Sequence, residues 1–308
     1  MQGYNIGYYI RRIRKERGIC QEVLYEGLCS RSTLHRIESG EQQPGLFVAS
    51  QLLQRLGLDE SSFLLPLGPQ DFEISNLQKE IISLNAQSRF AEALEKIARL
   101  ETIVVPQDKL AQQFILRAKA LAGYECDGKR CPYDYPTQRQ MLMQALELTC
   151  AGINLENMRG FLLGEDETKI INQIAITYSE EGKRRQAIEI YRQLIRYVES
   201  HFPDCEVRQV MLPLTAYNYS RLLGLERRYE EAIEVAELGR QCCVKYNKCR
   251  MLGGLLLNIA CCLHEMGEDE KSKELLIQSY YVGLAMENFQ DCEVIKRYAK
   301  ETIGLLLN

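Results

Sequence analysis

The side chains best suited to bind a metal or attack a substrate are twelve cysteines and three histidines. Zinc sites combine closely spaced Cys and His ligands, and the sequence contains no CxxC pair. Cys261 and Cys262 lie in an apolar stretch, where cysteine is typical of a small core residue. We therefore expect no metal, no cofactor and no enzyme activity. Redox sensing by one exposed thiol stays open, and it would require a lowered thiol pKa.

A second candidate for chemistry is the segment of residues 123–130, which nearly matches a phosphate-binding loop. That loop needs Ser or Thr after its lysine to bind magnesium, whereas Arg130 follows Lys129 in this sequence. Glu125 and Asp127 would also repel a phosphate. We therefore interpret the segment as an exposed loop between helices that binds no nucleotide.

The most specific pattern lies in residues 20–44. A short amphipathic helix is followed by Gly27, which permits a tight turn, and by Ser30, which can cap a second helix. Leu34 and Ile37 turn one face of that second helix inward. Four polar residues share its outward face: Arg31, Ser32, His35 and Arg36. Arginine can donate two hydrogen bonds to guanine, and serine suits phosphates or base edges, so this face is suited to DNA.

The whole motif resembles the XRE-type, lambda-repressor-like helix-turn-helix, and the similarity covers residues 5–65. It rests on Gln21-Glu22, Leu24, Glu26 to Ser30, Leu34, Arg36 to Glu38, Gly40 and Pro44. The resemblance implies a recognition helix over Ser30 to Ser39 in the major groove of double-stranded DNA. The implied DNA-binding residues are Gln21, Ser30, Arg31, Ser32, Thr33, His35 and Arg36. It also implies an internal salt bridge between Arg14 and Glu38.

Two residues depart from that pattern. Cys20 stands at the N-cap of the first helix of the motif, where Ser, Thr or Asn would cap better. Glu41 lies close to where a phosphate should pass and would repel it. The alternative is therefore a helix-turn-helix that has lost DNA binding and serves only in dimerisation.

The chain after residue 70 contains a degenerate helical repeat. Three stretches align without gaps, and their turns fall at Gly182, Arg227 and Gly267, in steps of 45 and 40 residues. An earlier echo lies at residues 88–94, and small residues follow the turns at Ala93, Ala187 and Ala232. The pattern resembles tetratricopeptide repeats. It predicts about five helix pairs that stack into an α-solenoid with a concave surface.

An XRE module followed by such repeats resembles the peptide-responsive quorum-sensing regulators of Gram-positive bacteria, the Rgg/PlcR group. The turn at residues 26–30 and the stretches 145–149 and 167–175 are particularly similar to theirs. The resemblance implies a homodimer whose solenoid binds a short signalling peptide. That peptide would alter DNA binding or the recruitment of a partner.

Aligned amides support a peptide groove. The three repeats place Gln173, Asn218 and Asn258 at one equivalent position, on the first helix of each pair. A carboxamide offers both a donor and an acceptor, which suits a peptide backbone of any sequence. Internal bridging between helices is the alternative role. Earlier helices would add Gln113 and Arg117, and Arg117 would pair with a ligand carboxylate or with an acidic neighbour.

Length and charge set the domain plan. The 308 residues predict two domains, and the prolines and glycines of residues 57–69 break helix. We expect an all-α protein with a helix-turn-helix domain at residues 1–66 and a repeat domain for peptide binding and dimerisation at 67–308. The net charge of −4 argues against nucleic-acid binding over the whole surface, yet residues 1–65 hold eight basic and seven acidic side chains.

The function we expect is peptide-controlled transcription regulation in the cytoplasm. The N-terminus lacks a signal-peptide pattern, and no apolar run of 18 residues predicts a membrane span. The alternative is a protein–protein adaptor whose repeats dock a folded partner, with a helix-turn-helix that tethers it to DNA and with no peptide ligand. A narrow, deep groove would favour the peptide, and a broad, flat one the adaptor.

Overall fold

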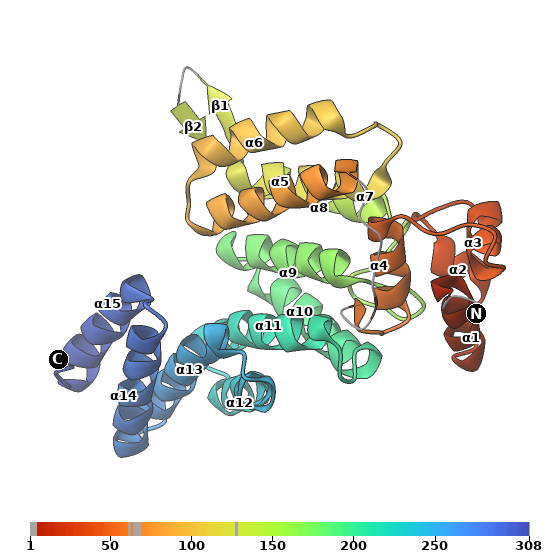
Figure 1. Ribbon diagram of the computed structural model, residues 1–308. Coiled ribbons are helices and arrows are strands. Elements are labelled where there is room, and N and C mark those ends of the chain that lie inside the picture. The colour runs from red at the N-terminus through yellow and green to blue at the C-terminus, as the bar shows by residue number, and fades with distance from the viewer. Residues whose placement is uncertain (1–4, 61–62, 64–68, 127–128, 308) are drawn as a thin grey trace. The chain divides into compact units, whose positions relative to one another are not determined.

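The structure is a computed structural model that describes residues 5–60, 63, 69–126 and 129–307. It divides into two compact units, Met1–Glu181 and Gly182–Asn308. Nearly all of the regular secondary structure in the described residues is helical, which confirms the predicted all-α class (Figure 1). None of the described helices is long and apolar enough to cross a membrane.

Four short helices begin the first unit: α1 (Ile6–Glu16), α2 (Gln21–Tyr25), α3 (Arg31–Glu38) and α4 (Leu46–Arg55). Their apolar residues meet in one core that includes the fully buried Ile10 and Leu52. The predicted turn is confirmed, because Gly27 adopts a φ of +71°. The predicted cap is confirmed as well, since the Ser30 hydroxyl accepts a hydrogen bond from the Thr33 amide at 3.1 Å. These helices form the expected helix-turn-helix bundle.

The repeats of the first unit follow as five longer helices: α5 (Pro69–Ala86), α6 (Phe90–Ile103), α7 (Lys109–Ala122), α8 (Tyr135–Glu147) and α9 (Glu165–Glu180). Ile81, Ile97 and Phe114 belong to a core shared by α5, α6 and α7. Helix α8 packs between α7 and α9. The predicted domain boundary at residues 66 and 67 lies outside the described residues.

A short β-hairpin interrupts the helices of the first unit. Strands β1 (Tyr124–Cys126) and β2 (Lys129–Cys131) pair antiparallel, with Tyr124 opposite Cys131. The sequence predicts an exposed loop here; residues 124–126, 129 and 130 are exposed, but they belong to strands of three residues, which are too short to show alternation. Gly123 allows the turn into β1 with a φ of +88°, and a Cβ there would lie 2.3 Å from the Cys131 carbonyl oxygen.

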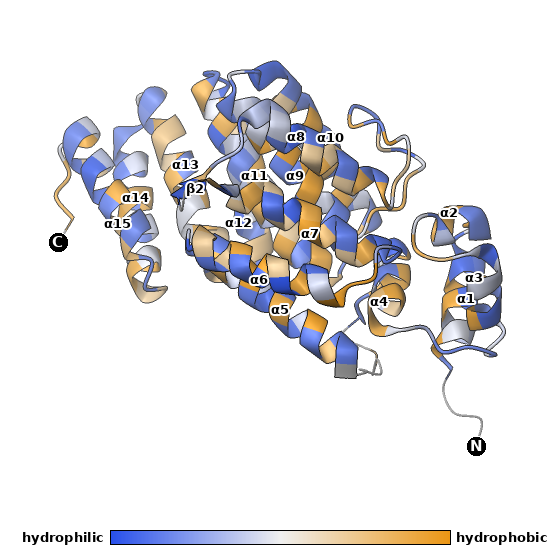
Figure 2. Ribbon diagram, turned by 90° about the horizontal axis from the view of Figure 1, so that it is seen from above, coloured by the Kyte–Doolittle hydropathy of each residue, from blue (hydrophilic) through white to orange (hydrophobic). Residues whose placement is uncertain are grey.

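The second unit continues the repeats with six α-helices: α10 (Arg184–His201), α11 (Glu206–Leu225), α12 (Tyr229–Tyr246), α13 (Leu252–Glu265), α14 (Asp269–Ala285) and α15 (Phe289–Tyr298). Two short turns, η2 (Cys249–Met251) and η3 (Ala299–Ile303), precede α13 and follow α15. Successive helices pack on each other from α10 to α15. Each helix mixes hydrophilic and hydrophobic residues, as expected when one face is covered by a neighbour (Figure 2).

The turns inside the helix pairs confirm the predicted repeat register. Left-handed backbone recurs at the same place in five turns: Ser88, Gly182, Arg227, Gly267 and Glu287. Five residues later stands a buried small residue: Ala93, Ala187, Ala232, Ser272 and Cys292. The turn before α15 was missed because it has neither a glycine nor an alanine. The eleven helices α5 to α15 of the described residues are enough in number for the expected five pairs, with one helix left over.

Candidate nucleic-acid interface and repeat pocket

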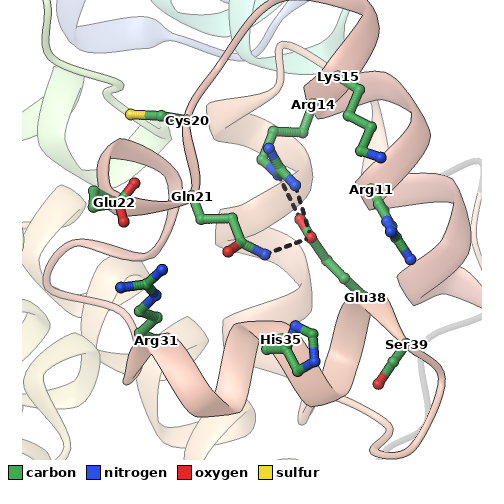
Figure 3. Close-up of a pocket in the computed structure, with 10 residues that line it drawn as sticks. All are labelled: Arg11, Arg14, Lys15, Cys20, Gln21, Glu22, Arg31, His35, Glu38 and Ser39. Atoms are coloured by element: carbon green, nitrogen blue, oxygen red, sulfur yellow. Dashed lines mark hydrogen bonds and ion pairs between the residues drawn. The ribbon is translucent and has the colours of Figure 1, made fainter.

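A hollow of about 440 Å³ lies between α1, α2 and α3. Four basic residues line it: Arg11, Arg14, Lys15 and Arg31 (Figure 3). Its other lining residues are Cys20, Gln21, Glu22, His35, Glu38 and Ser39. The hollow therefore joins the predicted recognition helix to a basic face of α1.

A buried ion pair holds this hollow together and confirms the predicted salt bridge. The guanidinium of Arg14 donates from Nε to Glu38 Oε1 at 2.5 Å and from Nη2 to Oε2 at 2.8 Å. Glu38 is 2 % exposed. Burial by itself would raise the pKa of Glu38, but hydrogen bonds from Arg14 and Gln21 outweigh it and lower that pKa. The pair ties α1 to the end of α3, so Arg14 serves the fold.

The predicted DNA-binding residues lie on or beside α3. Exposed side chains on α3 and at its cap are Ser30, Arg31, Ser32, His35 and Arg36. Thr33 is half-buried and its hydroxyl lies 2.8 Å from that of Ser30. Gln21 is half-buried and donates from its amide to Glu38 Oε2 at 2.8 Å. Gln21 therefore lines the hollow in a fixed orientation.

Sequence reasoning missed Arg11 and Lys15 as members of this surface. Both are exposed on α1 and face the hollow (Figure 3). Their spacing of four residues around Arg14 was the available signal, because positions i, i+3 and i+4 share one helix face. With Arg14 neutralised by Glu38, the lining has three basic side chains against the carboxylate of Glu22. Such a surface attracts phosphate.

The two departures from the family pattern are visible in the structure. Cys20 is the N-cap of α2, and its side chain makes no capping hydrogen bond. The carboxylate of Glu41 accepts a hydrogen bond from the Ser39 hydroxyl at 2.9 Å. Glu41 is thereby held at the end of α3.

The predicted peptide-binding amides fall on first helices of the pairs, as expected from the alignment. Gln173 on α9, Asn218 on α11 and Asn258 on α13 are all half-buried. The Asn258 amide donates to the Tyr217 carbonyl oxygen and to the Ser220 hydroxyl, both at 2.9 Å. Asn258 therefore bridges α13 to α11, which is the internal role foreseen as the alternative.

Gln113 and Arg117 have partners within the first unit. Gln113 is buried, and its amide donates to the Ala145 carbonyl oxygen at 3.1 Å and to the Thr149 hydroxyl at 2.7 Å. Arg117 donates to the Asp166 carboxylate at 3.2 Å. Of the two partners considered for Arg117, the structure contains the acidic neighbour. Gln113 is therefore bonded inside the first unit.

A pocket of about 490 Å³ in the second unit lies among α11, α13, α15 and the start of α12. Three tyrosines line it, namely Tyr217, Tyr229 and Tyr298, together with apolar residues that include Leu257 and Val294. Asn258 belongs to its wall. Charged groups at the pocket are Arg221, Arg227 and Glu265. The sequence did not predict this aromatic lining, because the three tyrosines share no repeat position.

Most buried cysteines behave as core residues. Six are buried: Cys150, Cys205, Cys242, Cys243, Cys262 and Cys292. Burial raises the pKa of Cys150 to about 12 and that of Cys243 to about 11. Because the thiolate is the reactive form, these thiols are poor candidates for redox sensing.

Comparisons with known proteins agree with this architecture. A family model described as the RNPP family C-terminal domain matches residues 78–296, and one described as helix-turn-helix matches residues 10–63. None of the curated proteins compared with the chain matches it. The crystal structure of Bacillus thuringiensis PlcR in complex with the peptide PapR7 and DNA is similar, with a TM-score of 0.60 and 20% identity. That match covers 94% of this chain and 98% of the other.

The apo form of Bacillus thuringiensis PlcR is similar to the same degree, with a TM-score of 0.59 and 20% identity over 94% of this chain and 97% of that one. At this level of identity the likeness establishes the fold.

Proposed function

The chain belongs to the RNPP family, and we propose that it is a cytoplasmic transcriptional regulator that reads double-stranded DNA as a homodimer and is controlled by a short peptide bound to its repeats. The observation that carries the DNA half is the exposed basic face shared by α1 and α3. The observation that carries the peptide half is the tyrosine-lined pocket of the second unit.

The DNA half assigns different tasks to the two helices. Arg31 and Arg36 on α3 are exposed, and a guanidinium can donate two hydrogen bonds to guanine in the major groove. Arg11 and Lys15 on α1 would hold phosphates, which fix the register without reading sequence. The Arg14–Glu38 pair keeps the two helices in one arrangement.

A homodimer follows from the weak charge of one copy. Residues 1–65 hold eight basic and seven acidic side chains, and two of the eight, Arg14 and Arg55, are buried. Affinity for DNA depends strongly on the number of phosphates neutralised. Two copies on half-sites about one helical turn apart double that number.

The peptide half is supported by the lining of the pocket in the second unit. The pocket is lined mainly from α11, α13 and α15, and Tyr229 at the start of α12 completes it. A hollow lined by tyrosine rings and apolar side chains suits an apolar side chain of a peptide. Asn218 and Gln173 remain proposed contacts for a peptide backbone. Arg117 remains a proposed contact for a peptide carboxylate.

The test of the DNA half is selection of a duplex by the full chain, followed by substitution of α3. Arg36→Ala should lower affinity for the selected duplex by about 1–3 kcal/mol, because a base contact is lost. Lys273→Ala is the control, since Lys273 pairs with Glu270 on α14. Equal affinity of Arg36→Ala and the parent chain would show that α3 does not read the groove as assigned.

The test of the peptide half is isothermal titration of the full chain with a library of short peptides. Val294→Arg would fill the pocket and should abolish the binding of any peptide that the parent chain binds. Val244→Arg is the matched control, because Val244 is 58% exposed on α12 outside the pocket and Val294 is 43% exposed. Absence of peptide binding by the parent chain would overturn this half and leave the adaptor.

A further inference from the structure

The turn of the helix-turn-helix packs directly on the backbone of Thr149, in the connection between α8 and α9. A Cβ added to Gly27 would lie 2.4 Å from Thr149 Cα and 2.6 Å from its carbonyl oxygen. Glycine is therefore required at position 27 by this close approach as well as by its φ of +71°. The turn that positions α3 is in contact with the repeats of the same unit.

Arg55, the last residue of α4, ties this contact together. The side chain is 1% exposed. Its Nη1 donates to the carbonyl oxygens of Leu24 at 3.0 Å and Glu26 at 2.6 Å, and its Nη2 donates to that of Thr149 at 3.0 Å. One planar guanidinium thus holds the turn before α3 and the segment after α8. The compact ammonium of lysine cannot reproduce this planar fork.

Thr149 is also hydrogen-bonded to the start of α9. Its hydroxyl donates to Glu167 Oε1 at 2.7 Å, and Glu167 Oε2 accepts from the Gly164 amide at 2.9 Å. Gln54 of α4 adds a second link, because its side-chain oxygen accepts from the Glu165 amide at 2.9 Å. Glu167 and Thr149 are buried. The end of α4 is therefore joined to the beginning of α9 by a continuous set of hydrogen bonds.

A polar junction of this kind selects one arrangement. Apolar surfaces can slide with little loss, whereas buried donors and acceptors are satisfied only when their partners stand at the right place. The same groups can bond to water if the parts separate.

We propose that Arg55 is a positioning residue for DNA reading, which sets the orientation of α3 from the α8–α9 segment of the repeats. This inference rests on the proposed function, since it requires that α3 binds DNA. It assigns Thr149 and Glu167 as the groups that connect Arg55 to α9. Through them, a change in the repeats of the first unit reaches the recognition helix.

Hydrogen exchange of the full chain, with and without a selected duplex, tests the proposal. Coupling is reciprocal, so DNA bound to α3 should slow exchange at residues 147–151 and 164–168 by about tenfold, although these residues are not on the DNA face. Arg55→Lys should remove this DNA-dependent slowing and weaken affinity for the duplex about tenfold. A merely structural role would lower stability without removing the response to DNA.

The matched control is Arg139→Lys. Arg139 is another buried arginine of the first unit, but it pairs with Glu181 and donates to the Thr177 carbonyl oxygen, away from the junction. It should keep the DNA-dependent slowing. Thr149→Val is the second variant if Arg55→Lys does not fold; it removes the hydroxyl, keeps the shape and should also lose the slowing.

Two outcomes overturn the proposal and are distinguishable. If the parent chain binds the duplex without slower exchange at residues 147–151 and 164–168, or if both variants retain the slowing, the junction does not position α3 and the proposed function stands. If the parent chain selects no duplex, the proposed function fails and the role of Arg55 in DNA reading fails with it.

Discussion

The basic face of α1 and α3 and the pocket of the second unit differ in the kind of ligand that each one suits. The basic face exposes Arg11, Lys15, Arg31 and Arg36 to solvent, and one buried ion pair beneath them fixes the helices. The pocket is lined mainly by tyrosine rings and apolar side chains, with Asn258 anchored to a neighbouring helix. The first suits a charged polymer, and the second suits a side chain that leaves water.

The difference separates the parts of each region that hold the fold from the parts that meet the ligand. On the basic face, the fold depends on Arg14 and Glu38, whereas the proposed contacts are exposed and replaceable. In the pocket, the lining residues belong to the packing of α11, α13 and α15 as well. Substitutions on the basic face should therefore divide cleanly into stability and binding effects, and those in the pocket should not.

Removal of the buried ion pair between Arg14 and Glu38 should have the largest effect on the basic face, because this pair holds α1 against α3. Glu38→Ala leaves the Arg14 guanidinium buried and without its carboxylate, which should lower the free energy of unfolding by about 3–5 kcal/mol. Glu16→Ala is the control, because its ion pair with Arg12 is exposed and should contribute about 1 kcal/mol or less. Urea unfolding of the full chain measures both; equal losses would contradict the structural role of the pair.

The same pair should make the stability of the bundle depend on acid. Because the pKa of Glu38 is lowered in the fold, its ionised form contributes stability above the ordinary carboxyl pKa, and this contribution is lost as pH falls through the lowered value. Glu38→Gln should flatten the dependence of stability on pH in that acidic range. Unfolding curves measured from neutral to acidic pH check this, and an unchanged pH profile would contradict it.

A methyl group added at Gly27 should lower stability by more than backbone strain alone, because the turn packs against the repeats. Gly27→Ala meets an unfavourable φ and collides with Thr149, whereas Gly18→Ala, at a φ of +66°, has open space around it. The first should lose about 1–3 kcal/mol more stability than the second, since overpacking adds to strain. Thermal unfolding of both variants decides; equal losses would mean that the turn does not press on Thr149.

Salt concentration should change DNA binding by the basic face much more than peptide binding by the pocket of the second unit. This is the smallest of the expected effects. Arg11→Ala and Lys15→Ala should each weaken DNA binding uniformly across sequences and reduce the slope of log affinity against log salt by about 1. Peptide binding to the pocket of the second unit should change little over the same salt range, because it buries apolar surface. Titrations from low to moderate salt test both, and an unchanged slope in the α1 variants would remove these residues from the phosphate contact.

Local structure could be predicted from the sequence where one residue type determines the backbone conformation. Gly27, Gly182 and Gly267 lie at left-handed turns as expected, since glycine adopts them without strain. Arg227 and Glu287 occupy the same turns without being glycine, so only the repeat register revealed the first of them and nothing revealed the second. The hairpin at residues 124–131 was too short for a periodic signal.

Contacts between residues far apart in the sequence could not be predicted from the sequence. Arg55 ends an amphipathic helix, where arginine is usually exposed, and its burial depends on Thr149, 94 residues later. Likewise, Gln113 suits a ligand by its chemistry but is bonded inside the first unit. The helix-turn-helix carries a sequence motif that predicts roles for Arg31 and Arg36, whereas the three pocket tyrosines lie on different helices and share no repeat position.

The most direct test of peptide-controlled DNA binding is the affinity of the full chain for its selected duplex, measured with and without a peptide that binds the repeats. Binding of the two ligands is linked, so a regulator must show a change of about 5-fold or more in duplex affinity when peptide is bound. The same factor must appear in peptide affinity when the duplex is bound. A duplex affinity that is identical with and without bound peptide would contradict the account.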